Sequence, residues 1–272
     1  MDSKRILYVS QEIHPYLPEN EISKPSLSLP KKMNEKGHQV RVFMPRYGLI
    51  NERRHQLHEV IRLSGINIII NDMDQPLIIK VASVPQARMQ VYFIDNEEFF
   101  KRKSTFYDED DNFFEDNDQR AIFFCRGVVE TVKKLGWSPD IIHCHGWMAS
   151  FLPMYLKKFH YDDPLFAESK LVLSAYDHKE EKMPATLKQT LEFDGITGDD
   201  LAKWEDADIN KLYAAGANYC DAAVVGSENV SEEVKEMLKK SVDTVLDYTG
   251  EEDQAEKTHE LYKSIVVEES IA

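Results

Sequence analysis

The sequence predicts an α/β fold, a doubly wound and mostly parallel sheet with an inserted antiparallel ribbon. Two observations lead to this prediction. Short apolar runs that hardly alternate, as in strands buried on both faces, recur through most of the chain. Segments with helical periodicity separate these runs, and a strand–helix–strand order favours parallel strands joined by right-handed crossovers.

The first strand–helix–strand unit spans the N-terminal 44 residues. Residues 5–9 and 39–44 are the expected strands, and residues 28–36 are the expected helix between them. Gly37 follows at once and is a typical helix-terminating residue. The next part differs, because three β-like runs lie close together with turn residues between them, at residues 66–70, 77–82 and 90–94. These runs predict the antiparallel ribbon.

The second half returns to alternating elements. Residues 118–135 form a strongly amphipathic pattern that predicts a long helix. Ser227 is expected to cap a helix that runs to residue 239, with Glu232 and Glu233 near its positive end. The other expected elements are strands at 141–144, 170–173, 222–225 and 242–246, and helices at 147–158, 209–215 and 251–264. We expect residues 1–240 to form one lobe and residues 241–272 an acidic strand and helix that cap it.

The charge of the chain is concentrated in two places. The 272 residues carry 33 Lys and Arg against 48 Asp and Glu, a formal net charge of −15. Residues 108–118 and 228–272 hold the whole excess of acidic residues, so the rest of the chain is neutral. No broad basic face is expected, which argues against nucleic acid as a partner. The acidic segment 108–118 is expected to be a solvated surface loop with its aromatic residues folded under, or alternatively a docking element for a partner.

The N-terminus and the cysteines favour a cytoplasmic protein. The apolar run at residues 6–9 is too short for a signal-peptide core, and no 18-residue apolar window exists, so no membrane partner is expected. The three cysteines are an odd number at wide spacing, which fits reduced thiols better than a disulfide framework.

In doubly wound sheets, ligands bind beyond the carboxyl ends of the strands. Three loops lie there: the loop after Val9, the loop that starts at His145 and the loop after Leu173. The first loop, residues 10–22, contains no glycine and carries Glu19 and Glu21 where a phosphate would need donors. A dinucleotide site or a P-loop is therefore excluded.

The segment His143-Cys144-His145 raises the question of a metal site. Neighbouring strand residues point to opposite faces, so only His143 and His145 share a side. No third ligand is evident, and we expect no metal.

The loop after the first strand and the later strand-end motifs resemble one known family. The matching segments are ILYVSQEIHP (6–15), LPK (29–31) and GHQVRVFMPRYG (37–48), then DNDQRAIFF (116–124), PDIIHCHGW (139–147) and PMYLK (153–157), and more weakly AAVVGS (222–227). With these segments the chain resembles the N-terminal lobe of bacterial glycogen/starch synthases, the family 5 glycosyltransferases with the two-lobed GT-B fold. The resemblance implies a single Rossmann-like lobe of the GT-B fold.

The resemblance also implies roles for individual residues. His145 aligns with the active-site histidine of the family, and Glu12, His145 and Trp147 are the implied glucan-binding residues. For Trp147, packing of a helix against the sheet is the alternative, and we favour it. Gly146 stands where the family has the aspartate of a His-Asp-Trp motif.

The donor-binding features of the family are not matched. Its diphosphate loop, Lys-Thr-Gly-Gly-Leu, aligns with Pro18, Glu19, Asn20, Glu21 and Ile22, so no donor-phosphate site is expected and no cofactor is implied. Nothing after residue 240 has the length or composition of a second lobe. The sequence therefore predicts an α-glucan-binding or regulatory lobe that cannot transfer glucose from ADP-glucose by itself. The alternatives are half of a two-chain glycosyltransferase whose donor lobe is a separate polypeptide, and a non-catalytic protein-interaction module. The partners that these interpretations imply are an α-glucan, a second protein chain or a homo-oligomer.

Overall fold

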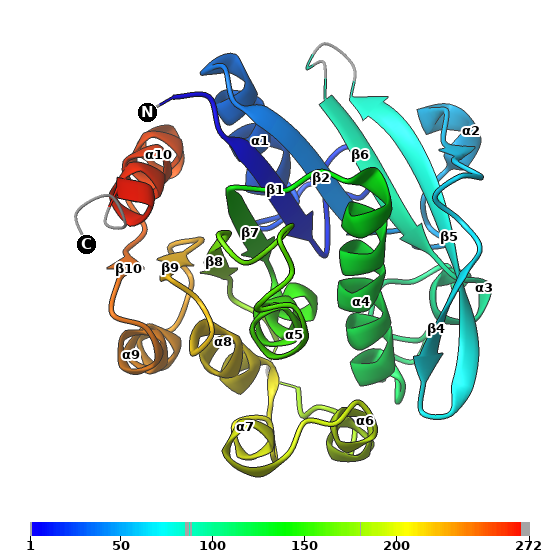
Figure 1. Ribbon diagram of the computed structural model, residues 1–272. Coiled ribbons are helices and arrows are strands. Elements are labelled where there is room, and N and C mark those ends of the chain that lie inside the picture. The colour runs from blue at the N-terminus through cyan, green and yellow to red at the C-terminus, as the bar shows by residue number, and fades with distance from the viewer. Residues whose placement is uncertain (1, 85–86, 88, 180, 268–272) are drawn as a thin grey trace.

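The computed structural model describes residues 2–84, 87, 89–179 and 181–267. At its centre lies a ten-stranded sheet in the order β10-β9-β8-β7-β1-β2-β6-β5-β3, with β4 paired to β5 (Figure 1). Every pairing from β10 to β6 is parallel, which confirms the predicted α/β class. The parallel strands are β1 (Arg5–Ser10), β2 (Gln39–Pro45), β6 (Met89–Asp95), β7 (Ile141–His145), β8 (Lys170–Ala175), β9 (Ala222–Val225) and β10 (Val245–Leu246).

The sheet is wound in two directions from its middle. The chain leaves β1 through α1 (Pro25–Glu35) toward β2, and it leaves β7 through α5 (Phe151–Phe159) in the opposite direction toward β8. In Figure 1, α4 (Asn117–Leu135), α5 and α8 (Ile209–Ala217) lie in front of the sheet and α1 lies behind it. The reversal of strand order falls between β1 and β7, where a crevice at the carboxyl ends is expected to receive a ligand.

The predicted antiparallel ribbon is present and continues the main sheet. β5 (Met73–Val84) pairs antiparallel with β6, with β4 (Ile66–Ile70) and with the short β3 (His58–Glu59). Asn71 and Asp72 connect β4 to β5, and both have positive φ, 46° and 69°. A two-residue loop of this kind matches the twist of a hairpin and favours Asn and Asp.

Several predicted boundaries are wrong in detail. α1 begins at Pro25, three residues earlier than expected, because proline is well suited to a first helical turn. The helix expected at 147–158 is a 3₁₀ turn, η1 (Trp147–Ser150), followed by α5. Ser227 does not cap α9 (Glu232–Ser241). The cap is Ser231, whose hydroxyl accepts the Val234 N–H. Four short helices were not predicted: α2 (Glu52–His55), α3 (Glu97–Phe100), α6 (Leu187–Phe193) and α7 (Gly198–Ala202).

The chain after α9 returns to the sheet and then to α1. β10 pairs parallel with β9, and α10 (Glu251–Val267) packs against α1. The inward face of α10 buries Leu261, Tyr262 and Ile265. Within the described ranges, no helix combines the length and apolarity that crossing a membrane requires.

Candidate functional site

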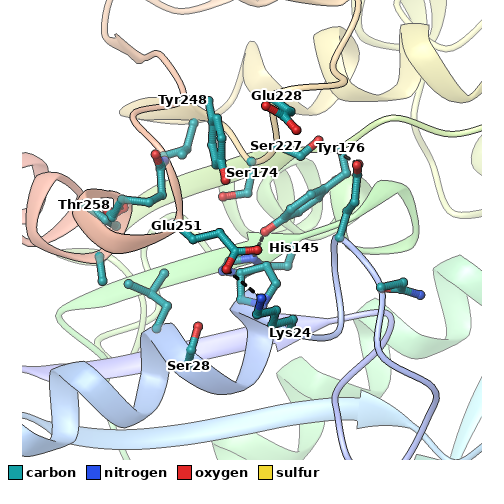
Figure 2. Close-up of a pocket in the computed structure, with 18 of the residues that line it drawn as sticks. Lys24, Ser28, His145, Ser174, Tyr176, Ser227, Glu228, Tyr248, Glu251 and Thr258 are labelled. Carbon is teal, nitrogen blue, oxygen red and sulfur yellow. Dashed lines mark hydrogen bonds and ion pairs between the residues drawn. The ribbon is translucent and has the colours of Figure 1, made fainter.

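A cavity of about 500 Å³ opens at the carboxyl ends of the central strands (Figure 2). Its floor comes from the ends of β7, β8 and β9, one side from the loop before α1 and from α1, and the other side from α10. The cavity therefore lies at the crevice that the strand order predicts. Its lining residues are Glu19, Asn20, Glu21, Lys24, Pro25, Ser28, Leu29, His145, Ser174, Tyr176, Val224, Gly226, Ser227, Glu228, Tyr248, Glu251, Gln254, Ala255 and Thr258.

His145 ends β7 and lies in the floor of this cavity. Its ring is 1% exposed, and its Nδ1 lies 2.7 Å from the Tyr176 hydroxyl. Its Nε2 is buried and makes no hydrogen bond with any described residue. Burial lowers the pKa of His145 to about 3, so the imidazole is neutral at neutral pH. A neutral ring has one donor and one acceptor nitrogen, so Nε2 is free to bond a hydroxyl group.

A second buried histidine, His143, lies beside His145. The rings of His143 and His145 lie with their centroids 4.1 Å apart. His143 Nε2 lies 2.7 Å from the Ser174 hydroxyl, and its Nδ1 lies 2.5 Å from the hydroxyl of Tyr262 on α10. Both nitrogens of His143 are thus already hydrogen-bonded. Among the described residues, no group of three His, Cys, Asp or Glu side chains is placed to hold a metal ion.

The loop before α1 is held together by its own polar groups. The Asn20 side-chain oxygen accepts the N–H groups of Ile22 and Ser23, at 2.9 and 2.7 Å. The N–H of Asn20 donates to the Ser23 hydroxyl at 2.9 Å, and the N–H of Lys24 donates to the Asn20 carbonyl. A phosphate at a helix N-terminus needs such N–H groups to be free. These groups already have acceptors inside the protein.

The cavity is rich in carboxylates. Glu19, Glu21, Glu228 and Glu251 line it, and Lys24 is the only Lys or Arg among the described lining residues. Lys24 is already paired: its ammonium lies 2.6 Å from Glu251 and 3.8 Å from Glu19. The electrostatic potential inside the cavity therefore opposes the binding of an anionic ligand.

Glu12 and Trp147 lie outside the lining of this cavity. Glu12 is 8% exposed, and its carboxylate accepts hydrogen bonds from Asn20 at 2.5 Å and from Gln11 at 3.3 Å. Burial raises the pKa of Glu12. Trp147 is completely buried, with Phe106 and Phe113 packed against its ring. A role for either residue in glucan binding stays a prediction.

Gly146 adopts a backbone conformation that leaves no room for a side chain. Its φ is 86° and its ψ 166°, a region that is essentially reserved for glycine. A Cβ at this position would lie 2.3 Å from Oε1 of Gln11. The Gln11 amide is fixed there because Oε1 accepts the N–H of Met148 at 3.2 Å. An aspartate, which the resemblance places here, does not fit this arrangement.

Several lining residues were not anticipated from the sequence. Ser174 belongs to the end of β8 and Tyr176 follows that strand directly, so their position at its carboxyl end was an available signal. Tyr248 and Gln254 come from the segment around α10, and nothing in the local sequence pattern directs that segment to the crevice. Figure 2 shows Tyr248 and Tyr176 on different sides of the cavity, with their rings directed into it.

Comparison with known proteins identifies the family. Residues 5–248 match the family model described as the starch synthase catalytic domain. The chain belongs to this family. The glycogen synthase of Chlorobium limicola is 35% identical over 233 residues, which cover 85% of this chain and 47% of that protein. The glycogen synthase of Chlorobium luteolum is 36% identical over 216 residues, covering 79% of this chain and 44% of that protein.

A solved structure supports the same assignment of the fold. The catalytic domain of starch synthase IV from Arabidopsis thaliana, bound to ADP and acarbose, superposes with a TM-score of 0.74 at 16% identity, covering 92% of this chain and 52% of that one. The predicted Rossmann-like lobe of the GT-B fold is thereby confirmed. The chain spans about half the length of the curated relatives it matches. α10 lies beyond the segment that the family model matches.

Proposed function

We propose that the cavity at His145 binds a neutral α-glucan and that this chain does not by itself transfer glucose from ADP-glucose. The observation that carries this proposal is the chemistry of the wall formed by residues 18–24. Its N–H groups are bonded within the loop, and the neighbouring carboxylates outnumber the one ammonium group. Transfer from a nucleotide sugar requires stabilisation of the leaving diphosphate, and the carboxylates near this wall carry the same negative charge as the diphosphate.

The same cavity suits an uncharged sugar. The free nitrogen of His145 can bond one hydroxyl, and carboxylates such as Glu228 are strong hydroxyl acceptors. Tyr248 offers an aromatic ring at the mouth, against which the apolar face of a sugar ring can pack. The membership in a family of glycogen and starch synthases favours an α-glucan among neutral ligands.

Calorimetry on the purified chain tests both halves of the proposal. We expect measurable binding of maltoheptaose, a loss of at least tenfold in affinity in His145→Ala, and no binding of ADP-glucose under the same conditions. His58→Ala is the matched control, because His58 lies exposed on β3 away from the cavity and should leave affinity unchanged. Circular dichroism of both variants checks that the fold is intact.

Two results would overturn the proposal. If ADP-glucose binds more tightly than maltoheptaose, the argument from the carboxylate wall is wrong. If no α-glucan binds, or if His145→Ala binds maltoheptaose as well as the parent does, the cavity is not the glucan site.

A further inference from the structure

One wall of the cavity belongs to α10. Glu251, Gln254, Ala255 and Thr258 follow one another at helical spacing and line the cavity together. An ion pair between Glu251 and Lys24 joins this wall to the residue just before α1 (Figure 2). Departure of α10 would remove the wall and widen the entrance to His145.

One of the contacts that hold α10 against the rest of the chain is a pair of buried histidines. His38, directly before β2, and His259 of α10 are 4% and 7% exposed, and their Nε2 atoms lie 3.1 Å apart. His38 Nδ1 accepts the backbone N–H of Lys4 at 3.1 Å, so the proton of the neutral His38 ring is on Nε2. His38 therefore donates to His259, whose own proton is on Nδ1.

Adding a proton to either ring disrupts this pattern of hydrogen bonds. A proton added to His259 would place an N–H at Nε2, facing the N–H of His38. A proton added to His38 would go to Nδ1, where the N–H of Lys4 already donates. Burial lowers the pKa of both histidines, and each also lies in the positive field of Lys36 and Lys263. The docked helix thus favours the neutral pair. Once α10 has left, His259 is free to take up a proton, whereas His38 still accepts the N–H of Lys4 at Nδ1.

Two other titratable side chains, Glu256 and His143, lie against the pair or against α10. Glu256 lies 3.8 Å from His259 Nδ1 and pairs with Lys36 at 2.6 Å, and that ion pair is exposed. From the sheet, His143 bonds Tyr262 of α10, and its burial lowers its pKa well below the usual value. Protonation of His143 would also weaken docking, so its effect has the same sign.

We propose that α10 is a gate on the cavity, closed while the His38–His259 pair is neutral and released when acid protonates the pair. The gate itself stands on these contacts, and only its consequence for sugar entry rests on the proposed function. A histidine free in solution titrates near pH 6.5. Below that pH, each histidine that gains a proton on release favours the open state by up to about tenfold per pH unit.

Hydrogen exchange of the full chain measures this equilibrium without any ligand. A released helix of 17 residues is marginal in water, so opening of α10 exposes its amides. After correction for the intrinsic exchange rate, we expect protection across residues 251–267 to fall about 100-fold between pH 7.5 and 5.5 if both histidines titrate, and about tenfold if one does. Protection of α4 in the same sample is the reference for global stability and should change little.

Three variants separate the histidine pair from the exposed ion pair. His259→Gln and His38→Gln each remove one titrating ring, so each should flatten the pH dependence of α10 protection. Lys36→Gln removes the contact with Glu256 and should leave the pH dependence in place. If α10 protection follows α4 at every pH, or if both glutamine variants keep the parent's pH dependence, the proposal is wrong.

A final experiment tests whether release of α10 controls the entry of the sugar. Stopped-flow mixing with maltoheptaose should show faster association at pH 5.5 than at pH 7.5 in the parent chain and a smaller difference between the two pH values in His259→Gln. If α10 opens with acid while maltoheptaose binds at no pH, the gate is supported and the proposed glucan function fails.

Discussion

Replacing Gly146 by alanine tests whether the Gln11 side chain leaves no room for a Cβ at position 146. The backbone strain of a side chain at φ 86°, ψ 166° costs on the order of 1–3 kcal/mol. The Cβ would also push the Gln11 amide from its place, because it would lie 2.3 Å from Oε1. The loss of the hydrogen bond to Met148, with the N–H left buried, adds roughly 1–3 kcal/mol. We therefore expect Gly146→Ala to lower the free energy of unfolding by about 2–6 kcal/mol.

The chain offers a control for a positive φ without the steric contact. Gly195 has nearly the same φ, 89°, and a Cβ added there meets no described atom within 4 Å. Urea unfolding of both variants gives the difference between them, provided that the slope of the transition is unchanged. We expect Gly146→Ala to be destabilised by about 1–3 kcal/mol more than Gly195→Ala. In a chain that already carries Gln11→Ala, the additional destabilisation of Gly146→Ala over Gly195→Ala should disappear. Equal losses in the two glycine variants, within about 0.5 kcal/mol, would refute the steric argument.

Three further predictions concern buried or charged groups. Glu21→Gln removes one cavity carboxylate, so binding of ADP-glucose, which the parent lacks, should become detectable at low salt. Salt at 0.5 M should suppress this gain, and a titration as flat as that of the parent would contradict the charge argument. Burial raises the pKa of Asp118 to about 6, although Thr186 donates a hydrogen bond to its carboxylate. The free energy of unfolding should therefore fall as pH rises from about 4 to 6. At pH 7.5, Asp118→Asn should be more stable than the parent by up to about 3 kcal/mol. Tyr262→Phe leaves His143 without its hydroxyl partner and should cost about 1–3 kcal/mol, whereas an unchanged urea midpoint would show that this bond contributes nothing.

The parts of the fold that follow from local sequence were predictable. The strand β1 and the helix α4 each carry a strong hydrophobic pattern, and their predicted spans agree with the structure to within one residue. The start of α9 was misplaced because both Ser227 and Ser231 can cap a helix. The structure resolves the choice through a distant contact: the Ser227 hydroxyl donates to the carboxylate of Glu21, which only folding brings near.

The candidate site was predictable only where it depends on strand ends. The position of His145 followed from the parallel-sheet rule, and the acidic loop that carries Glu19 was recognised from the residues alone. The wall formed by α10 could not be predicted, because the contact between His38 and His259 joins residues more than 200 positions apart. No periodicity or motif reports such a pairing, since burial and tertiary packing decide it.

The proposed function requires that this family member bind a neutral glucan and not the nucleotide sugar. Titration of the purified chain with maltoheptaose and, separately, with ADP-glucose is the decisive measurement. We expect binding of maltoheptaose that weakens at least tenfold in His145→Ala, and no heat from ADP-glucose. Tight binding of ADP-glucose, or glucose transfer from it by this chain alone, would show that the proposed function is wrong.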